Sequence, residues 1–499
     1  MMYLILTNIK VDTKDGHPSI LEHDNLILKL KTYEDRIQQL TKKNAKPDEE
    51  SIVKTKSDSD QNNLSVSDHE QVYWSKVGVD EHTKNCDSDF GFSLIDRWRK
   101  AKTEVCSSTT DSTIHCHKIL QTGHSGTDNF CYVKNMILDV NKAEKPYLSG
   151  SMFSSCKKES SWNSNEYQLY LANLMSNVQT DTKKKQTKTL TGRTFFIERD
   201  GHANVFHSFT DIVNLFMAVL IHSKGSEVSD MKNNRIIILD SHDNGPFYDV
   251  WKLFGEVYRV EEFKKEYADQ VIQFEDAVFG IPGGSNFLWK DVWIPNKCYE
   301  STILKAFVRF VMSEWKISEH KRRLPNEPIR ILFSVRKHKN VQAKIGRRIM
   351  NEEELIKLLN EKLTTVSTDN KIPVQVTAID LGTIGFKEQI EKVRQADIFV
   401  GMHGAGMTHV LWMHDESVVV ELFPKGWHSS GMRNISKWLG RVYLSWQNVH
   451  DKNVADAEHL WTHVEEEEFL QVMKAASQIV QSFHLGSGVD HQNLKFVPK

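Results

Sequence analysis

The chain has 499 residues, enough for two or three domains, with 39% hydrophobic and 26% charged side chains, as in ordinary globular proteins. Its 64 basic and 66 acidic side chains give a formal net charge of -2. This balance argues against nucleic acid as the main partner, because nucleic-acid-binding proteins carry a basic excess. The apolar runs are strand-sized, well short of the ~20 residues that span a bilayer, so we expect no membrane span. Residues 1–10 show no basic stretch followed by a long apolar run, so no signal peptide is predicted there.

Residues 1–80 are predicted to be poorly ordered. Segment 41–70 is rich in Lys, Asp, Glu, Ser and Asn, so apolar burial there cannot offset the entropy of ordering. The next region, 81–190, holds five of the six cysteines. None of them forms a Cys-x-x-Cys pair, the spacing that is typical of a structural zinc site, so a zinc site is not favoured. Two or three disulfides in an oxidising compartment and free buried thiols fit these cysteines equally well.

From residue 191 the pattern changes to alternating strands and helices, and we predict a first Rossmann-like domain over 191–325. Apolar runs without alternation are typical of strands that are covered on both faces. The predicted elements are a strand at 194–198, a helix at 206–220, a strand at 235–240 and a helix at 300–315.

The pattern is most regular over 326–450, where we predict a second Rossmann-like domain. Strands that alternate with helices at this spacing imply βαβ units and a parallel sheet. Asn351 is predicted to cap one of the helices, with Glu354 as its capping-box partner. Residues 451–499 add a helix and a tail. The predicted strands lie at 329–334, 374–379, 397–400, 418–422 and 441–446, and the helices at 351–363, 386–394 and 465–483.

A glycine-rich turn follows the strand at 397–400. In an open parallel sheet such a turn faces the crevice at the carboxyl ends of the strands, where ligands bind. Glycine lets the backbone approach a ligand, and the following helix presents free N–H groups and its positive dipole end. We therefore predict a phosphate or diphosphate site at His403, Gly404, Ala405 and Gly406, supported by Glu421 at the next strand end. A structural turn without a ligand is the alternative.

Basic side chains follow the strand at 329–334 and precede the helix at 351–363. They are Arg336, Lys337, His338, Lys339, Lys344, Arg347 and Arg348. Guanidinium groups at the same sheet edge as the glycine turn would clamp a pyrophosphate. Arg336 and Arg347 are the predicted ligands because they lie nearest the strand end and the helix start, and the others are expected to be solvated.

His207 and Asp211 lie four residues apart on the predicted helix at 206–220, so they share one face. Such a pair is able to accept a proton from a hydroxyl group, which makes both candidate catalytic residues. A purely structural pair is an equal alternative. The spacing also suits metal ligands, but no third ligand is evident, and we predict no metal site.

The glycine turn and its flanks resemble glycosyltransferase family 61. The matching run is DIFVGMHGAGMTH at 397–409, followed by VVVELFP. Supporting segments are IERD at 197–200 with the following VFHSFTDIVNLF, EDAVFGIP at 275–282, GRRIMNEEELI at 346–356 and GFKEQI at 385–390. The resemblance covers roughly residues 190–480, and within the family it is strongest to members that modify EGF-like domains.

This resemblance implies an α/β fold of GT-B type, in which two Rossmann-like domains enclose the active site in the cleft between them. It implies inverting transfer of N-acetylglucosamine from UDP-GlcNAc to Ser or Thr hydroxyls of EGF-like domains of secreted or membrane proteins, in the endoplasmic reticulum lumen. The turn at 403–406 and Glu421 would bind the nucleotide sugar, and Arg336 and Arg347 the diphosphate. His207 and Asp211 would lie on the acceptor side.

The chain departs from the family pattern at two places. Glu256-Val257-Tyr258 stands where relatives carry an Asp-aromatic-Asp triplet, so no obligatory metal cofactor is expected. The end of the chain, 495–499, carries no retrieval signal, so the lumenal location rests on the resemblance. Two alternatives stay open: an O-mannose-directed N-acetylglucosaminyltransferase of the same family, and a non-catalytic protein that binds glycoprotein or nucleotide.

Overall fold

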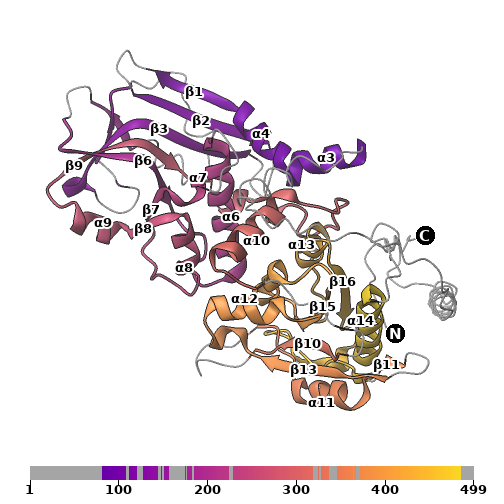
Figure 1. Ribbon diagram of the computed structural model, residues 1–499. Helices are drawn as coiled ribbons and strands as arrows, with labels where there is room; N and C mark the ends of the chain where they lie inside the picture. The colour runs from indigo at the N-terminus through magenta and orange to yellow at the C-terminus, as the bar shows by residue number, and fades with distance from the viewer. Residues whose placement is uncertain are drawn as a thin grey trace, which may run out of the picture.

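The structure is a computed structural model with two α/β lobes (Figure 1). It describes residues 81–484 except for 108–111, 121–126, 144–147, 149–150, 157–174, 176, 182–184, 224–228, 282, 319–323, 325–326, 337–345, 364 and 367–370. Several predictions lie outside the described residues: the poor order of 1–80, the tail after 484, and the solvation of Lys337, His338, Lys339 and Lys344.

The N-terminal lobe is built on one sheet with the strand order β1-β2-β3-β9-β6-β7-β8. Strands β9, β6, β7 and β8 are parallel, whereas β1, β2 and β3 form an antiparallel extension that joins β9. The sheet therefore continues across residue 190, where the sequence suggested a domain boundary. Its strands are β1 (Lys102–Ser107), β2 (Thr113–Leu120), β3 (Thr127–Asp139), β6 (Lys188–Ile197), β7 (Asn234–Ile238), β8 (Gly255–Arg259) and β9 (Val271–Phe279), with β4 (Met152–Ser154) and β5 (Val178–Thr180) at its margin.

The central helix of this lobe is α6 (Val205–His222), which follows β6. Asn204 caps it, because its side chain accepts hydrogen bonds from the backbone N–H groups of Phe206 and His207. Among the described residues α6 alone is long and apolar enough to cross a membrane, and 89% of it is buried inside the protein. The other helices are α3 (Glu81–Phe90), α4 (Phe92–Lys100), α7 (Ser229–Lys232), α8 (Tyr248–Trp251), α9 (Val260–Glu266) and α10 (Thr302–Glu314).

The C-terminal lobe carries an all-parallel sheet with the strand order β13-β10-β14-β15-β16. The strands are β10 (Ile329–Ser334), β13 (Val374–Ile379), β14 (Ile398–Met402), β15 (Val418–Phe423) and β16 (Val442–Gln447). The helical elements are α11 (Glu352–Lys362), α12 (Phe386–Arg394), the 3-10 helix η7 (Ala405–Trp412), α13 (Gly431–Trp438) and α14 (Glu466–His484). The predicted α/β class and parallel sheet are confirmed.

Asn351 precedes α11, as expected, but its side chain forms no capping hydrogen bond. Instead its Nδ2 donates to the carbonyl oxygen of Val464, and its Oδ1 accepts from the N–H of Val464, both at 2.9 Å. The predicted capping box with Glu354 is therefore wrong, because the amide is used to hold the segment that leads into α14. Phe469 of α14 is fully buried in the core of this lobe.

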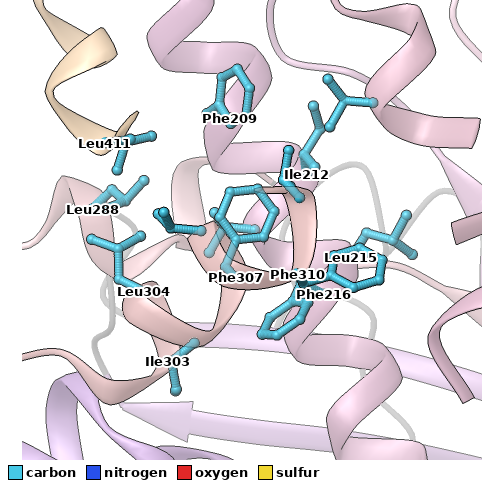
Figure 2. Close-up of a cluster of buried hydrophobic side chains, with 14 of the residues drawn as sticks. Phe209, Ile212, Leu215, Phe216, Leu288, Ile303, Leu304, Phe307, Phe310 and Leu411 are labelled. Atoms are coloured by element: carbon cyan, nitrogen blue, oxygen red, sulfur yellow. The ribbon is translucent and has the colours of Figure 1, made fainter. Parts of the chain in front are cut away.

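One hydrophobic core runs through both lobes. Figure 2 shows side chains of α6 and α10 facing one another, with Leu411 of η7 packed against them from the C-terminal lobe. The ring centroids of Phe209 and Trp412 are 5.4 Å apart, and those of Phe247 and Phe386 are 4.9 Å apart. This continuous packing holds the two sheets in a defined relation, because close-packed cores resist displacement.

All six cysteines form disulfides, so the free-thiol alternative does not hold in this structure. The pairs are Cys86–Cys298, Cys106–Cys156 and Cys116–Cys131. The first joins α3 to the segment before α10, across a sequence separation of 212 residues.

Candidate functional site

The strand order of the C-terminal sheet creates a switch point between β10 and β14. From β10 the chain passes to β13 on one side and then returns to β14 on the other side. In open parallel sheets, ligands bind in the crevice outside the carboxyl ends of two such strands. Arg336 follows the end of β10, and His403 and Gly404 follow the end of β14 directly. The structure therefore brings the glycine turn and Arg336 to the position where a ligand is expected.

Gly404 has a backbone conformation that other residues hardly adopt. Its φ of 150° and ψ of -176° lie in a region that is essentially reserved for glycine. A β-carbon at this position would also collide with the guanidinium group of Arg336, whereas a β-carbon at Gly406 would meet no atom within 4 Å. The helical element after the turn is η7, which starts at Ala405, directly behind Gly404.

The guanidinium group of Arg336 is fixed by backbone carbonyl groups. Nη2 donates to the carbonyl oxygens of Met402 and His403 at 3.3 and 3.2 Å, and Nη1 donates to that of Gly346 at 3.1 Å. Burial and the nearby charge of Arg347 lower the pKa of Arg336 to about 10, so it stays a cation at neutral pH. The side chain is thus a partly buried cation whose guanidinium group is bonded, within the described part of the chain, to backbone carbonyl oxygens.

Arg347 is the second cation of this edge. Its backbone has a left-handed φ of 59°, and its N–H donates to the carbonyl oxygen of His459 at 2.6 Å. The guanidinium carbon lies 5.3 Å from the ring centroid of Trp427, a cation–π distance. Trp427 follows the end of β15 and also lies near His403, with 6.3 Å between the ring centroids. Trp427 was missed from the sequence, although an aromatic residue just after a predicted strand end was a usable signal.

His403 is fixed through its side chain as well as its backbone. Its Nδ1 lies 2.6 Å from Oε1 of Glu421, and the hydroxyl group of Tyr443 donates to Oε2 of the same carboxylate at 2.6 Å. The ring of His403 stacks on Phe423 with the centroids 4.9 Å apart. Glu421 is completely buried, so its carboxylate contacts neighbouring side chains and is not open to the crevice.

The N-terminal sheet has its own switch point, between β6 and β9. The strand order β9-β6-β7-β8 places this point at the carboxyl end of β6, where Arg199 and Asp200 follow the strand. Arg199 binds Asp240 with two side-chain hydrogen bonds of 2.9 and 2.8 Å. Burial raises the pKa of Asp240, but Arg199 and Arg259 outweigh it and lower that pKa to about 2. This ion cluster anchors the loop that presents Asp200.

The hydrogen-bond partner of His207 is Asp200 and not Asp211. Nδ1 of His207 lies 2.5 Å from Oδ2 of Asp200, and the His207 side chain is 34% exposed. Its ring meets the ring of Trp289 edge to face at 5.2 Å between centroids. Neither Asp200 nor Trp289 was predicted, although Asp200 belongs to the strand-end motif IERD at 197–200. The i, i+4 spacing placed His207 and Asp211 on one helix face, but the Asp211 side chain turns elsewhere.

Asp211 is buried and serves as a backbone acceptor. Its Oδ2 accepts the N–H of Asp200 at 2.8 Å, and its Oδ1 lies so close to Gly283 that a β-carbon there would collide with it. Burial raises the pKa of Asp211 well above its ordinary value. The structure therefore places Asp211 beneath the His207–Asp200 pair, away from solvent.

The two switch points are connected through a short segment after Trp289. The carbonyl oxygen of Val292 accepts the N–H of Ser430 at 2.6 Å, and the ring centroids of Trp293 and Trp427 are 6.4 Å apart. Ser430 and Trp427 belong to the loop after β15. The segment after Trp289, whose ring meets His207, is thus in direct contact with the loop that holds Trp427.

The triplet Glu256-Val257-Tyr258 forms part of the edge strand β8. Glu256 is largely exposed, and its carboxylate lies 3.5 Å from Nη2 of Arg235. Over the described part of the chain, no group of three or more His, Cys, Asp or Glu side chains is arranged to hold a metal ion.

Comparison with known proteins identifies the family. The family model described as Glycosyltransferase 61 matches residues 152–420, more than half of the chain. The chain belongs to glycosyltransferase family 61. The resemblance seen in the sequence, and the predicted glycosyltransferase class, are thereby confirmed. The matched part of this family 61 chain includes both switch points and the glycine turn.

Curated relatives carry the name "EGF domain-specific O-linked N-acetylglucosamine transferase". The Xenopus laevis protein is 29% identical over 51% of this chain and 45% of its own length. The Pan troglodytes protein is 25% identical over 83% of this chain and 76% of its own length. The Drosophila melanogaster protein is 24% identical over 51% of this chain. The matched region thus spans less than half of the frog protein and about three quarters of the chimpanzee protein.

Proposed function

We propose that this family 61 chain is an inverting glycosyltransferase that moves N-acetylglucosamine from UDP-GlcNAc to Ser or Thr hydroxyls of EGF-like domains. The names of the relatives support the sugar and the acceptor class. The observation that carries the proposal is the contact between Arg336 and the Gly404 turn, at the switch point of a parallel sheet. A fixed guanidinium beside a helix start is suited to a diphosphate leaving group.

In this proposal the enzyme has the GT-B arrangement, with the active site in the cleft between the lobes. Residues 326–450 bind UDP-GlcNAc, with Arg336 and Arg347 near the diphosphate and the turn at 403–406 beneath it. Residues 191–325 carry the acceptor side. The contacts of Trp293 with Trp427 and of Val292 with Ser430 support a common cleft, because they bring the two sheet edges together.

His207 is the proposed general base, oriented by Asp200. It is partly exposed and hydrogen-bonded to a carboxylate, as is typical of a histidine that accepts a proton from a hydroxyl group. The acceptor oxygen bonds to C1 of the sugar while the C1–O bond to the β-phosphate breaks, and its electron pair leaves with UDP. The acceptor proton passes to His207. Asp211 is the weaker candidate because its carboxylate is buried beneath this pair.

We infer that the cationic groups of Arg336 and Arg347, together with the N–H groups at the start of η7, stabilise the departing UDP without an obligatory metal ion. We place the reaction in the endoplasmic reticulum lumen, which is an oxidising compartment. The three disulfides support this location, because disulfides persist where thiols are not kept reduced.

The test is a transfer assay with purified protein, radiolabelled UDP-GlcNAc and an isolated, folded EGF-like domain. We expect labelled EGF domain from the wild type and a rate that a chelator leaves unchanged. Loss of the rate with chelator would contradict the metal-free mechanism. Label on an O-mannosylated peptide and not on the EGF domain would favour the sibling activity. Binding of UDP without transfer to either acceptor would favour the non-catalytic alternative.

A further inference from the structure

A chain of hydrogen bonds leads from the interior of the C-terminal lobe to the glycine turn. It runs from the Tyr443 hydroxyl group through the Glu421 carboxylate to the imidazole of His403, with both links 2.6 Å long. Glu421 lies on β15 and Tyr443 on β16, so this chain is built from adjacent parallel strands. The role that we assign to this chain of hydrogen bonds rests on the proposed function, in which a nucleotide sugar binds at the glycine turn.

The carboxylate of Glu421 is buried and hydrogen-bonded through both of its oxygens. Oε1 faces Nδ1 of His403, Oε2 accepts the Tyr443 hydroxyl group, and the residue is 0% exposed. Burying a carboxylate is costly unless it is hydrogen-bonded, and here both oxygens are. A direct contact between Glu421 and the nucleotide sugar, which the sequence suggested, would require the donor to reach a carboxylate that is 0% exposed.

His403 is held through its backbone, through one ring face and through Nδ1. Its backbone N–H donates to the carbonyl oxygen of Leu422 at 2.8 Å, and its own carbonyl oxygen accepts from Arg336. One face of the ring lies on Phe423, and Nδ1 faces Glu421. Nε2 forms no hydrogen bond that is seen among the residues that the structure describes, and the His403 side chain is 10% exposed. It is the ring atom left to meet a ligand.

We propose that Glu421 is a positioning residue that acts on the donor only through His403. A carboxylate behind one imidazole nitrogen determines which nitrogen carries a proton and where the other one points. Glu421 accepts a hydrogen bond from Nδ1–H of an imidazolium ring, and Nε2–H of the same ring donates a hydrogen bond to the β-phosphate of the bound donor. Tyr443 holds the carboxylate in place from behind.

In the transfer step His403 keeps its protons. As the C1–O bond to the β-phosphate breaks, negative charge grows on the phosphate oxygen, and the hydrogen bond from Nε2 strengthens. The positive charge on the imidazole is balanced by Glu421, and Arg336 and Arg347 supply the remaining positive charge at this edge. The interaction therefore contributes more to the transition state than to donor binding, which affects kcat more than KM.

The test is a double-mutant cycle with Glu421→Gln and His403→Ala, measured as kcat and KM for UDP-GlcNAc with an EGF domain as acceptor. Glutamine keeps the shape of Glu421 but removes its charge and replaces one of its two acceptor oxygens with an NH2 donor. We expect Glu421→Gln to lower kcat about 10- to 100-fold, as for other carboxylates behind a functional histidine, and to change KM by less than about threefold. In the His403→Ala background we expect the same substitution to change kcat by less than about twofold.

Two further variants guard against unfolding and indirect effects. His403→Gln, whose amide still donates to Glu421, is a second background for the cycle, because His403→Ala leaves a buried carboxylate without its partner. Glu468→Gln is the matched control, because Glu468 accepts a hydrogen bond from Trp446 in the same lobe and is bonded to no histidine among the described residues. We expect it to leave kcat unchanged. Thermal melting of every variant separates loss of fold from loss of positioning.

Additive effects of Glu421→Gln and of the His403 substitutions would overturn the proposal, since Glu421 would then act on the donor independently. So would an effect on KM alone. If the wild type binds UDP but does not transfer sugar, the same cycle is measured on UDP affinity, and additivity there overturns the proposal equally. If the wild type neither transfers sugar nor binds UDP, the proposed function fails and the role of Glu421 falls with it.

Discussion

The guanidinium group of Arg336 occupies the space that a β-carbon on residue 404 would need. The same group donates a hydrogen bond to the carbonyl oxygen of His403, the residue before Gly404. The glycine and the arginine therefore depend on one another. Glycine makes room for the cation and also supplies a φ of 150°, and the cation holds the turn against the end of β10. Two of the candidate ligands are thus a single structural unit.

This unit predicts different effects for two neighbouring glycines. Gly404→Ala introduces backbone strain of about 1–3 kcal/mol and displaces Arg336, so we expect UDP affinity to fall by tenfold or more and the melting temperature to fall. Gly406→Ala is the matched control, because its β-carbon meets no atom within 4 Å and its φ is not positive. Isothermal titration with UDP and thermal melting check both variants. Equal effects of the two substitutions would contradict the role given to Gly404.

Arg347 and Arg348 form a second matched pair. Arg347 lies on Trp427 beside His403, whereas Arg348 lies on Trp461 with 6.0 Å from its guanidinium carbon to the ring centroid. Lysine keeps the charge but loses the planar group that stacks and binds two phosphate oxygens. We expect Arg347→Lys to weaken UDP binding by about tenfold, a loss of about 1.4 kcal/mol of binding free energy. We expect Arg348→Lys to leave UDP binding unchanged. The reverse order would place the diphosphate elsewhere.

The general base is identified by comparing three variants. We expect His207→Ala to lower kcat by about 100-fold or more, and Asp200→Asn to lower it less, since it only weakens the orientation of His207. Asp211→Asn keeps an oxygen that accepts the N–H of Asp200, so we expect it to retain most of the activity. Transfer rates with a saturating donor check this. An inactive but folded Asp211→Asn protein would make Asp211 the base.

The same Asp211→Asn variant carries a prediction on stability. Folding raises the pKa of Asp211, so the folded protein holds a proton that the unfolded chain releases. The contribution of Asp211 to the free energy of unfolding is therefore fully present at low pH. It is lost as the pH rises from the pKa of Asp211 in the unfolded chain through its raised pKa in the folded protein. Asparagine removes that loss. We expect the variant to melt a few degrees higher than the wild type at pH 7.5, about 2 °C per kcal/mol or more, and no higher at pH 4.

His222 predicts sensitivity to acid. Burial, with the nearby charges of His117, Arg193 and Lys102, lowers the pKa of His222 to about 3. Because this pKa is lower than the value near 6.5 in the unfolded chain, acid favours the unfolded chain, which binds the proton more readily. The free energy of unfolding is therefore unaffected above about pH 6.5 and decreases as the pH falls from there toward 3. The slope is at most about 1.4 kcal/mol per pH unit. Chemical denaturation between pH 7 and pH 4 measures it. His222→Phe keeps the ring contacts, and we expect it to have a shallower slope.

The Cys86–Cys298 disulfide predicts a large effect of reduction. It closes a loop between residues 212 positions apart, whereas Cys116–Cys131 closes one between residues 15 apart on the adjacent strands β2 and β3. Loop-closure entropy grows with loop length, and removing a native disulfide typically lowers the free energy of unfolding by about 2–5 kcal/mol. We therefore expect a larger loss of stability from removing the first disulfide than from removing the second. Equilibrium denaturation of the two double Cys→Ser variants compares them. A greater loss from the Cys116–Cys131 variant would contradict this.

The C-terminal sheet was largely predictable because its signals are local. Strands buried on both faces are continuous apolar runs, and β10 and β13 have the bounds predicted from them. The N-terminal extension was not predictable in the same way. The pairing of β3 with β9 joins residues more than a hundred positions apart, and no local pattern states which distant strand will be the neighbour.

For the candidate site, the sequence by itself determined which residues stand at the ends of two strands: Arg336 after β10, and His403 and Gly404 after β14. A strand end and a glycine turn can be recognised from consecutive residues, because both depend on local sequence. Only the tertiary structure decided which side chains meet. His207 meets Asp200 and not Asp211, and Glu421 turns inward to His403 and Tyr443. The physical reason is that the partner of a side chain depends on which groups packing brings next to it. The spacing of residues along the chain does not specify those groups.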